Sequence, residues 1–196
     1  MQGFTVHRGT IAVLPDDNVD TDRIIPARFL SMVTRSGYGE LLFNDVRGPG
    51  FALDQDEAKG ASILVVGTNF GCGSSREHAV WAIQQAGFKA VVAKRTESNA
   101  AYSDIFRQNS ANCGLLLVEL NETDHQVVAA AGSGAELVVD LPNQCVRLGA
   151  NEFPFDISPA SKDALIKGLD LVGTTLLLEG SISEFEAKSR EYVPQR

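Results

Sequence analysis

The groups with which this chain could do chemistry are concentrated in one run, Asn69-Phe70-Gly71-Cys72-Gly73-Ser74-Ser75-Arg76-Glu77-His78, which follows the apolar residues 63–66. A strand, a glycine-rich turn and a helix start, in that order, direct backbone N–H groups and a partial positive charge at an anion. Arg76 adds a planar guanidinium that can bind a carboxylate through two hydrogen bonds. Ser74 and Ser75 add hydroxyls that can bind a ligand or, once deprotonated, act as a base. The run therefore indicates an anion-binding site with a candidate base.

The same run also fits an ordinary helix start. Ser74 and Glu77 have the spacing of a capping box, in which each side chain bonds a backbone N–H and no ligand is involved. Two features favour the anion site. Glycines flank Cys72 on both sides, which a simple cap does not need. Arg76 lies in the first helical turn, where a cation is unfavourable unless an anion accompanies it. The pattern alone leaves both interpretations open.

Other glycine-rich sites are excluded by the residues that they require. No Lys follows the last glycine, as it does in a Walker phosphate loop, and Arg76 stands where a dinucleotide fingerprint has its third glycine. The GxSxG pattern of serine hydrolases is absent. Cys72 is more typical of a small buried thiol than of a nucleophile, and we expect His78 to make structural contacts rather than to catalyse.

Two further segments carry groups that could join this site. The acidic run from Asn18 to Asp22 is, by itself, typical of a capped turn before a helix. Arg35 lies among glycines in residues 33–39, a loop pattern in which an arginine is usually solvated. We expect Arg35 to matter only if the loop folds over Arg76 and offers a second carboxylate contact.

Composition restricts the class of protein. The chain has 196 residues, 44% of them hydrophobic, and a formal net charge of −8, which suits one compact domain and disfavours binding to nucleic acid or anionic membranes. Its three cysteines include no CxxC pair, which argues against a disulfide framework and against a metal cluster held by this chain alone. Without a signal-peptide pattern or a long apolar stretch, we expect a cytoplasmic protein.

Hydrophobic periodicity predicts an α/β fold. Strands are expected at residues 4–13, 62–66, 90–93, 115–118, 135–141, 144–148 and 151–155. Helices are expected at residues 26–33, 76–86, 98–109, 122–131, 158–167 and 182–190. Gly87 is expected to end the second of these helices. Strands and helices alternate in the middle of the chain, and the last third adds paired strands.

Taken together, the runs at residues 69–79, 18–22 and 24–27 resemble the small-subunit family of 3-isopropylmalate dehydratase, which corresponds to the swivelling domain of aconitase. Residues 33–39 and the tail from Gly168 to Tyr192 are similar to the bacterial leucine-biosynthesis form. The resemblance covers essentially the whole chain. It implies an aconitase-like swivelling β/β/α domain, with a mixed sheet and flanking helices, formed by residues 1–196 and ending in a helical tail at about 158–196.

The resemblance also implies a function. In this family the small subunit is active only with a large subunit that carries a [4Fe-4S] cluster. The pair interconverts 2-isopropylmalate and 3-isopropylmalate by dehydration and rehydration, a hydro-lyase reaction of leucine biosynthesis. We therefore expect a heterodimer with the iron–sulfur large subunit, a small dicarboxylate substrate, no cofactor or metal ligand on this chain, and no nucleic-acid or membrane partner.

By the same resemblance, Ser74 matches the serine that acts as the catalytic base. The expected substrate-binding residues are Ser75, Arg76, Arg35, Asp22 and Gly73.

Two alternatives stay open. The chain could serve a related hydro-lyase acting on citraconate, dimethylmalate or homoaconitate. The loop at residues 35–41 is expected to discriminate between these substrates, because it would face their variable side chain; Tyr38, Leu41 and Leu42 suit a branched apolar group. From a different class, the chain could be a non-catalytic anion-binding module.

Overall fold

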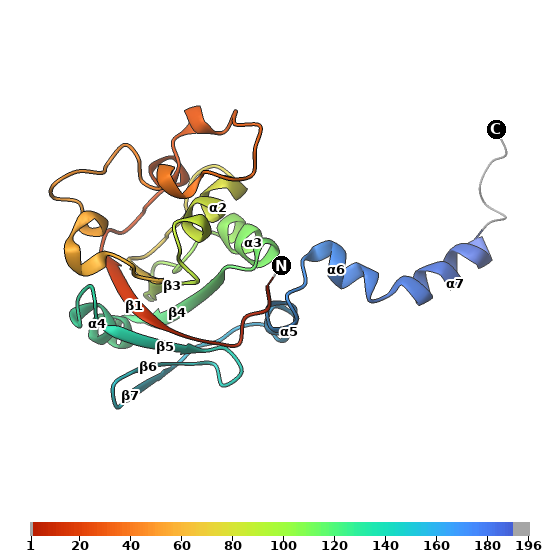
Figure 1. Ribbon diagram of the computed structural model, residues 1–196. Coiled ribbons are helices and arrows are strands. Elements are labelled where there is room, and N and C mark those ends of the chain that lie inside the picture. The colour runs from red at the N-terminus through yellow and green to blue at the C-terminus, as the bar shows by residue number, and fades with distance from the viewer. Residues whose placement is uncertain (1, 190–196) are drawn as a thin grey trace.

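One mixed sheet organises the chain. The computed structural model describes residues 2–189, and Figure 1 shows helices packed on the sheet while the last two helices extend away from it. Within the described residues, seven strands lie in the order β4-β3-β2-β1-β5-β6-β7. They are β1 (Val6–Leu14), β2 (Ile63–Val66), β3 (Ala90–Arg95), β4 (Leu116–Asn121), β5 (Glu136–Asp140), β6 (Cys145–Leu148) and β7 (Asn151–Pro154). The predicted α/β class with a mixed sheet and flanking helices is confirmed.

Helices alternate with strands in the middle of the sequence, and the last three helices follow one another at its C-terminal end. They are α1 (Thr21–Ile24), α2 (Glu77–Gln85), α3 (Asp104–Cys113), α4 (Glu122–Ala130), α5 (Pro159–Lys167), α6 (Leu171–Leu176) and α7 (Glu179–Ser189). Short 3₁₀ turns occupy Ala27–Phe29, Gly39–Leu41, Ala52–Asp54 and Asp56–Ala58 in the long connection between β1 and β2. None of the helices in the described part of the chain is long and apolar enough to cross a membrane.

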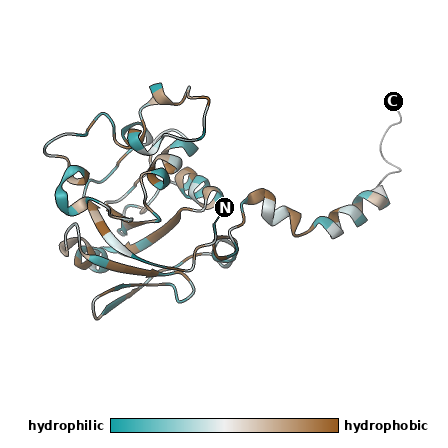
Figure 2. Cartoon of the chain, in the orientation of Figure 1, coloured by the Kyte–Doolittle hydropathy of each residue, from teal (hydrophilic) through white to brown (hydrophobic). Residues whose placement is uncertain are grey.

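Strands β1 to β4 run parallel and are buried on both faces. Leu64 of β2 pairs with Ala12 on one side and Val91 on the other. Leu64 faces the core cluster under α2 and α3, whereas its neighbour Ile63 faces the cluster that includes residues of α4 and α5. Figure 2 shows the resulting apolar colouring of these strands. Continuous apolar runs such as β2 are what a sheet covered on both faces requires.

Strands β5, β6 and β7 form an antiparallel extension on the other side of β1. The turn between β5 and β6 is fixed by Asp140, whose carboxylate accepts hydrogen bonds from the Asn143 N–H and the Arg147 guanidinium, each at 3.0 Å. The three strands predicted in this part of the chain are confirmed to within a few residues. Because β1 joins both halves, its end is fixed relative to the whole sheet.

The loops that leave β1, β2 and β3 meet at one edge of the sheet. Parallel strands all present their carboxyl ends at the same edge, which is where ligands usually bind in α/β folds. Residues 15–20, 67–76 and 96–103 leave this edge, and backbone hydrogen bonds join all three: Asn18 N–H to Thr68 O and Asn69 N–H to Ala100 O. The run singled out in the sequence therefore lies at the carboxyl edge.

Two predicted helices differ from those in the structure, and capping explains one of the differences. The helix predicted at residues 98–109 begins only at Asp104, because Ser103 caps it by accepting the Phe106 N–H. The residues before it form a loop that buries Tyr102, whose hydroxyl donates to carbonyls of β3 and β4. The helix predicted at residues 26–33 is a single 3₁₀ turn.

Two helices were not expected, and a third can be checked only in part. Neither α1, which forms within the acidic turn, nor α6 was predicted from periodicity, although α6 lies within the helical tail that the resemblance implies. The helix predicted at residues 182–190 begins earlier, at Glu179, and position 190 lies outside the described residues. Gly87, with a φ of 105°, ends α2 as predicted.

The buried His125 on α4 predicts how stability depends on pH. Burial lowers its pKa and nearby Lys94 adds to this, while the Val66 carbonyl and Asp17 oppose it. Because the pKa is lower in the folded chain, the unfolded chain takes up the proton first, so the free energy of unfolding falls as the pH drops below about 6.5. We expect His125→Gln to flatten this slope between about pH 7 and pH 5.5, measured by urea unfolding.

His7, whose pKa is also lowered by burial and by Lys89, supplies the internal comparison. The double variant His7→Gln, His125→Gln should be flatter still. An unchanged slope in the single His125 variant would contradict this account.

Candidate functional site

The site is built by two loop segments that run side by side. The Gly71 N–H donates to the Val19 carbonyl at 2.8 Å, and the Thr21 N–H donates to the Cys72 carbonyl at 2.9 Å. Between them, Asp20 and Cys72 form an isolated parallel bridge. These backbone bonds extend the pairing of β1 with β2 beyond the ends of the strands. They place the acidic turn beside the glycine-rich run.

Glycine is required at position 71 for two reasons. Its φ is 73°, in the left-handed region, and a Cβ there would lie 2.3 Å from Cγ of Phe106 on α3. The Gly71 carbonyl also accepts a hydrogen bond from the Ser103 hydroxyl at 2.6 Å. The loop is thus pressed against the start of α3. Gly73, with a φ of 87°, is left-handed but has more room, since its nearest neighbours would be 3.6 Å or more away.

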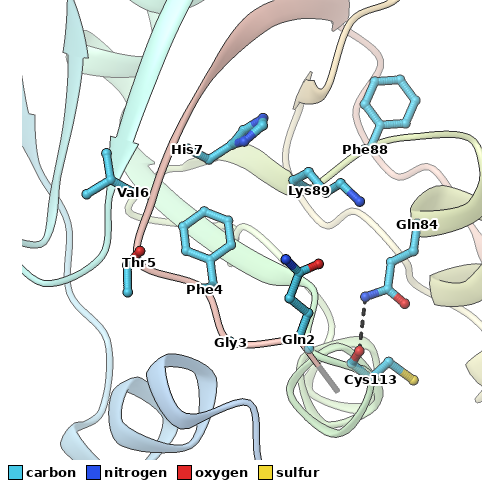
Figure 3. A pocket seen from close by; sticks show the side chains of 11 residues that line it. Gln2, Gly3, Phe4, Thr5, Val6, His7, Gln84, Phe88, Lys89 and Cys113 are labelled. Carbon is cyan, nitrogen blue, oxygen red and sulfur yellow. Dashed lines mark hydrogen bonds between the residues drawn. The ribbon is translucent and has the colours of Figure 1, made fainter.

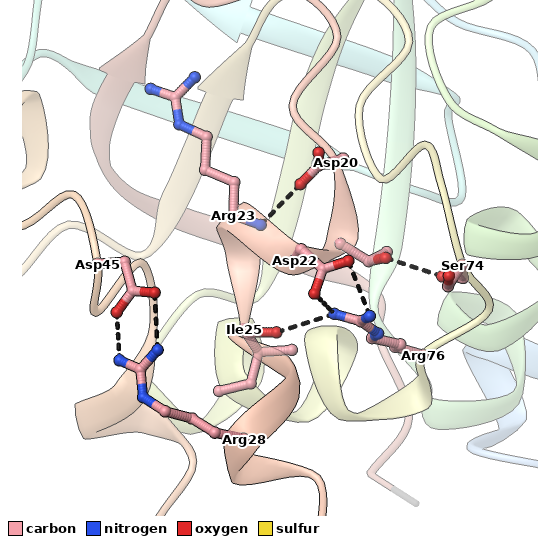
Figure 4. A network of polar contacts seen from close by, with 9 residues as sticks. Asp20, Asp22, Arg23, Ile25, Arg28, Asp45, Ser74 and Arg76 are labelled. Atoms are coloured by element: carbon pink, nitrogen blue, oxygen red, sulfur yellow. Dashed lines mark hydrogen bonds and ion pairs between the residues drawn. The ribbon is translucent and has the colours of Figure 1, made fainter.

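Arg76 and Asp22 meet across the two segments. The guanidinium donates to both carboxylate oxygens, with Nη2 to Oδ2 at 2.8 Å, and Nη1 also reaches the Ile25 carbonyl at 3.3 Å (Figure 4). The Arg76 side chain is only 11% exposed, whereas that of Asp22 is 55% exposed. Asp22 therefore supplies the anion that an arginine at a helix N-terminus needs, and it does so from the solvent side.

Ser74 does not cap a helix, so the capping-box prediction is wrong. Helix α2 begins at Glu77, with Arg76 in the N-cap position and no side chain bonded to the first N–H groups. Ser74 lies in the turn before it and is exposed; its backbone carbonyl accepts from the Thr21 hydroxyl at 2.8 Å. Its own hydroxyl forms no hydrogen bond within the described residues and is free to meet a ligand.

The next serine is oriented differently. Ser75 is exposed, and its hydroxyl lies 3.4 Å from the Asn109 amide of α3. Gly73 is exposed beside it. The predicted residues Asp22, Gly73, Ser74, Ser75 and Arg76 therefore come together at the carboxyl edge.

Arg35 stands apart from this group. Its guanidinium lies over the Trp81 ring of α2, 5.3 Å from the ring centroid, and its carbonyl accepts from Gln85. In the loop around it Val33 is exposed and Leu41 half-buried, but the other apolar residues expected to face a substrate are not accessible. Tyr38 and Leu42 are fully buried in the core, so the expectation that they face a substrate is wrong. Tyr38 instead packs edge-on against His78 and Trp81.

The cysteine and histidine of the run are structural. Burial and the nearby Asp20 raise the pKa of Cys72, which keeps it a thiol and makes it a poor nucleophile. The ring of His78 packs against those of Tyr38 and Trp81, which also contact each other. No group of three or more His, Cys, Asp or Glu side chains in residues 2–189 is arranged to bind a metal. The side chains of these described residues therefore do not fit an iron–sulfur cluster.

A separate cavity lies at the opposite edge of the sheet. It has a volume of about 340 Å³ and is lined by residues 2–7, by Gln84 and Phe88 near the end of α2, and by Lys89 and Cys113 (Figure 3). None of the predicted site residues lines it. The site residues predicted from the sequence, Arg35 apart, lie at the carboxyl edge of the sheet and not at this cavity.

Comparison with known proteins agrees with this architecture. A family model described as "Aconitase C-terminal domain" matches residues 1–123, and a second, described as LeuD_N, matches residues 127–159. The 3-isopropylmalate dehydratase small subunit of Corynebacterium jeikeium is 41% identical over 199 residues, covering 100% of this chain and 98% of the relative. The chain belongs to the family of 3-isopropylmalate dehydratase small subunits.

Other family members support this assignment. The small subunit of Lactococcus lactis subsp. cremoris is 40% identical, covering 96% of this chain and 99% of the relative. That of Bacillus cereus strain B4264 is 38% identical, covering 96% and 98%. A solved structure of 3-isopropylmalate dehydratase (leuD) from Methanocaldococcus jannaschii matches with a TM-score of 0.67 and 26% identity, covering 91% of this chain and 98% of that one. The related hydro-lyases and the non-catalytic module are not favoured.

The candidate site also depends on residues that were not recognised from the sequence. Thr21 is buried and fixes the Ser74 carbonyl, and Ser103 and Phe106 hold the Gly71 turn. Thr21 lies within a motif that the resemblance used, so its position was visible although its role was not. Ser103 and Phe106 lie about 30 residues along the chain, and no local pattern connects them to the turn.

The contact between Gly71 and α3 gives a stability prediction. A left-handed backbone conformation costs a non-glycine residue about 1–2 kcal/mol. Gly71→Ala should lower the free energy of unfolding by more than this, because the added methyl group also collides with Phe106. Urea unfolding measures the change.

The matched control is Gly132→Ala, which has a φ of 78° and nothing within 4 Å of the added Cβ. It carries the backbone cost alone. Equal losses in the two variants would show that the Phe106 contact does not matter.

Proposed function

We propose that this chain is the substrate-binding half of a 3-isopropylmalate dehydratase. It would interconvert 2-isopropylmalate and 3-isopropylmalate by loss and re-addition of water, together with a large subunit. Family membership at 37–41% identity over nearly the full length of the relatives supports this assignment. So does the placement of a largely buried Arg76 two residues after Ser74, whose hydroxyl has no partner within the described residues, at the carboxyl edge of the sheet.

Arg76 is proposed to hold one substrate carboxylate. Its guanidinium is mostly buried and is anchored by the Ile25 carbonyl, so the fork is fixed before a ligand arrives. Asp22 occupies the fork from the solvent side, and its exposure allows it to yield or share the fork when a carboxylate arrives. The contact between Asp22 and the substrate stays a prediction. It cannot be a hydrogen bond to a substrate carboxylate, because two ionised carboxylates have no proton to share.

Ser74 is proposed to take the proton from the carbon next to a carboxylate. A serine hydroxyl is a weak acid, so its deprotonated form needs stabilisation. The Arg76 cation is two residues away, and the first N–H groups of α2 have no capping side chain. Ser75 and Gly73 are proposed to complete the contacts to the substrate, and Arg35 would have to leave the Trp81 ring to add a second carboxylate contact.

A large subunit is implied by the names of the family members, and we propose that it carries the iron–sulfur cluster. When bound, such a cluster supplies a Lewis acid that assists departure of the hydroxyl group.

We also propose that the pair works in the cytoplasm and that residues 1–196 form one domain with a helical tail. In the structure α5 packs on the body through Leu165, and α6 and α7 extend away from the body (Figure 1).

The decisive experiment is reconstitution. Purified chain mixed with the cluster-loaded large subunit should convert 3-isopropylmalate, followed by the ultraviolet absorbance of the unsaturated intermediate, while neither subunit alone should do so. Ser74→Ala should lower kcat by about 100-fold or more and change KM little, because it removes the base and leaves the carboxylate contacts. Ser98→Ala, an exposed serine in the loop after β3, is the control. Normal kcat in the Ser74 variant would exclude it as the base.

Arg76→Lys tests the carboxylate contact. Loss of the two-pronged hydrogen bond should lower kcat/KM by about 10- to 100-fold, which corresponds to about 1.5–3 kcal/mol. Arg28→Lys is the matched control, because Arg28 makes a similar two-pronged pair with Asp45 and lies outside the predicted site (Figure 4). Equal kinetics for the two variants would contradict the role of Arg76.

A further inference from the structure

The two last helices expose an unusual amount of apolar surface. The first turn of α6 lies beside α3 and α5, and beyond it α6 and α7 extend from the body without packing against the sheet (Figure 1). Seven large apolar side chains here are between 38% and 69% exposed: Leu171, Val172, Leu176, Leu177, Leu178, Ile182 and Phe185. We call residues 169–189 the C-terminal arm. Figure 2 shows its apolar colouring concentrated in α6 and the turn that follows.

The size of this surface matches one side of a protein interface. From the exposed fractions, these seven residues together expose on the order of 700 Å² of accessible surface, backbone included. Each partner in a standard protein complex buries a similar area, roughly 800 Å². Helices of 6 and 11 residues are also too short to be stable alone in water, so the arm needs a surface to pack on.

Charge disfavours a second copy of this chain as that surface. Residues 169–189 carry four acidic side chains, Asp170, Glu179, Glu184 and Glu186, against Lys188 alone, and the whole chain has a net charge of −8. Two arms packed together would bring like charges close. An apolar groove bordered by Lys or Arg on a different protein fits the arm better.

The position of the arm points to the subunit that completes the site. The arm is tied to the body where the Leu171 N–H donates to the Asn112 side chain in the last turn of α3. The first turn of the same helix supports the Gly71 loop through Ser103 and Phe106. A helix of 10 residues is about 15 Å long, so a subunit that covers the carboxyl edge can reach the base of the arm as well.

We propose that the C-terminal arm docks into an apolar, basic-edged groove of the large subunit and holds the two halves of the active site together. This proposal rests on the proposed function, since it requires that a large subunit exists. The arm contributes affinity rather than chemistry. Its loss should therefore weaken association and leave the rate of the assembled complex unchanged.

The test replaces apolar side chains of the arm in the full-length chain. Leu177→Glu combined with Phe185→Glu should weaken binding to the large subunit at least 10-fold, measured by isothermal titration calorimetry. The rate at saturating large subunit should stay at the wild-type value. The control, Ser181→Glu combined with Ser183→Glu, adds the same charge at exposed polar positions of the arm and should bind within about 3-fold of wild type.

Folding is checked separately, because the arm contributes no side chain to the core. The double Glu variant should keep the Tm of the wild-type chain. Hydrogen exchange should slow at residues 171–189 when the wild-type chain binds the large subunit.

The outcomes separate this proposal from the function on which it rests. If the wild-type chain neither binds nor activates the large subunit, the proposed function fails. If wild type binds and the double Glu variant binds equally well, the docking proposal alone is overturned. It is also overturned if the Glu substitutions abolish self-association of this chain in sedimentation experiments and leave large-subunit binding intact, because the arm would then pair with a second copy.

Discussion

The backbone pairing between residues 17–22 and 68–74 is the constraint on which the rest of the site depends. Neither segment is a regular strand, yet their hydrogen bonds continue the parallel register of β1 and β2 past the end of the sheet. Because the two loops are fixed to each other, a buried cation on one can face an exposed carboxylate on the other. The Ser74 turn is held through its backbone rather than through its hydroxyl. Loops paired in this way hold their side chains in fixed positions, as strands do, and remain accessible to a ligand from solvent.

Regular elements with strong patterns could be predicted from the sequence, and contacts between distant segments could not. The buried strand at residues 63–66 and the helix ended by Gly87 follow from apolar runs and punctuating residues. The start of α3 was missed because Ser103 caps it, while serines at 98 and 110 offer similar local signals. The extra helix α6 was missed because its Gly and Thr residues weaken the helical pattern.

The same division applies to the site. Arg76 was recognised as a cation that required an anion, but only the fold reveals that Asp22, 54 positions away in the chain, is that anion. Ser74 had the spacing of a cap, and local pattern could not tell that the helix begins only at Glu77, after a turn that contains two left-handed glycines. Arg35 and Tyr38 lie in a glycine-containing loop that looked solvated or ligand-facing. An aromatic cluster with Trp81 and His78 ties that loop to α2 instead.

The short strand β7 has a consequence for how this chain meets other proteins. It lies at the edge of the sheet, spans four residues, and ends in Pro154, which has no N–H to donate. A neighbouring chain therefore cannot readily add a strand there, so this border resists the edge-to-edge growth by which sheets aggregate. The chain exposes apolar side chains in α6 and α7 and an open loop edge at the site. The β7 edge of its sheet, by contrast, offers little to a chain that could pair with it non-specifically.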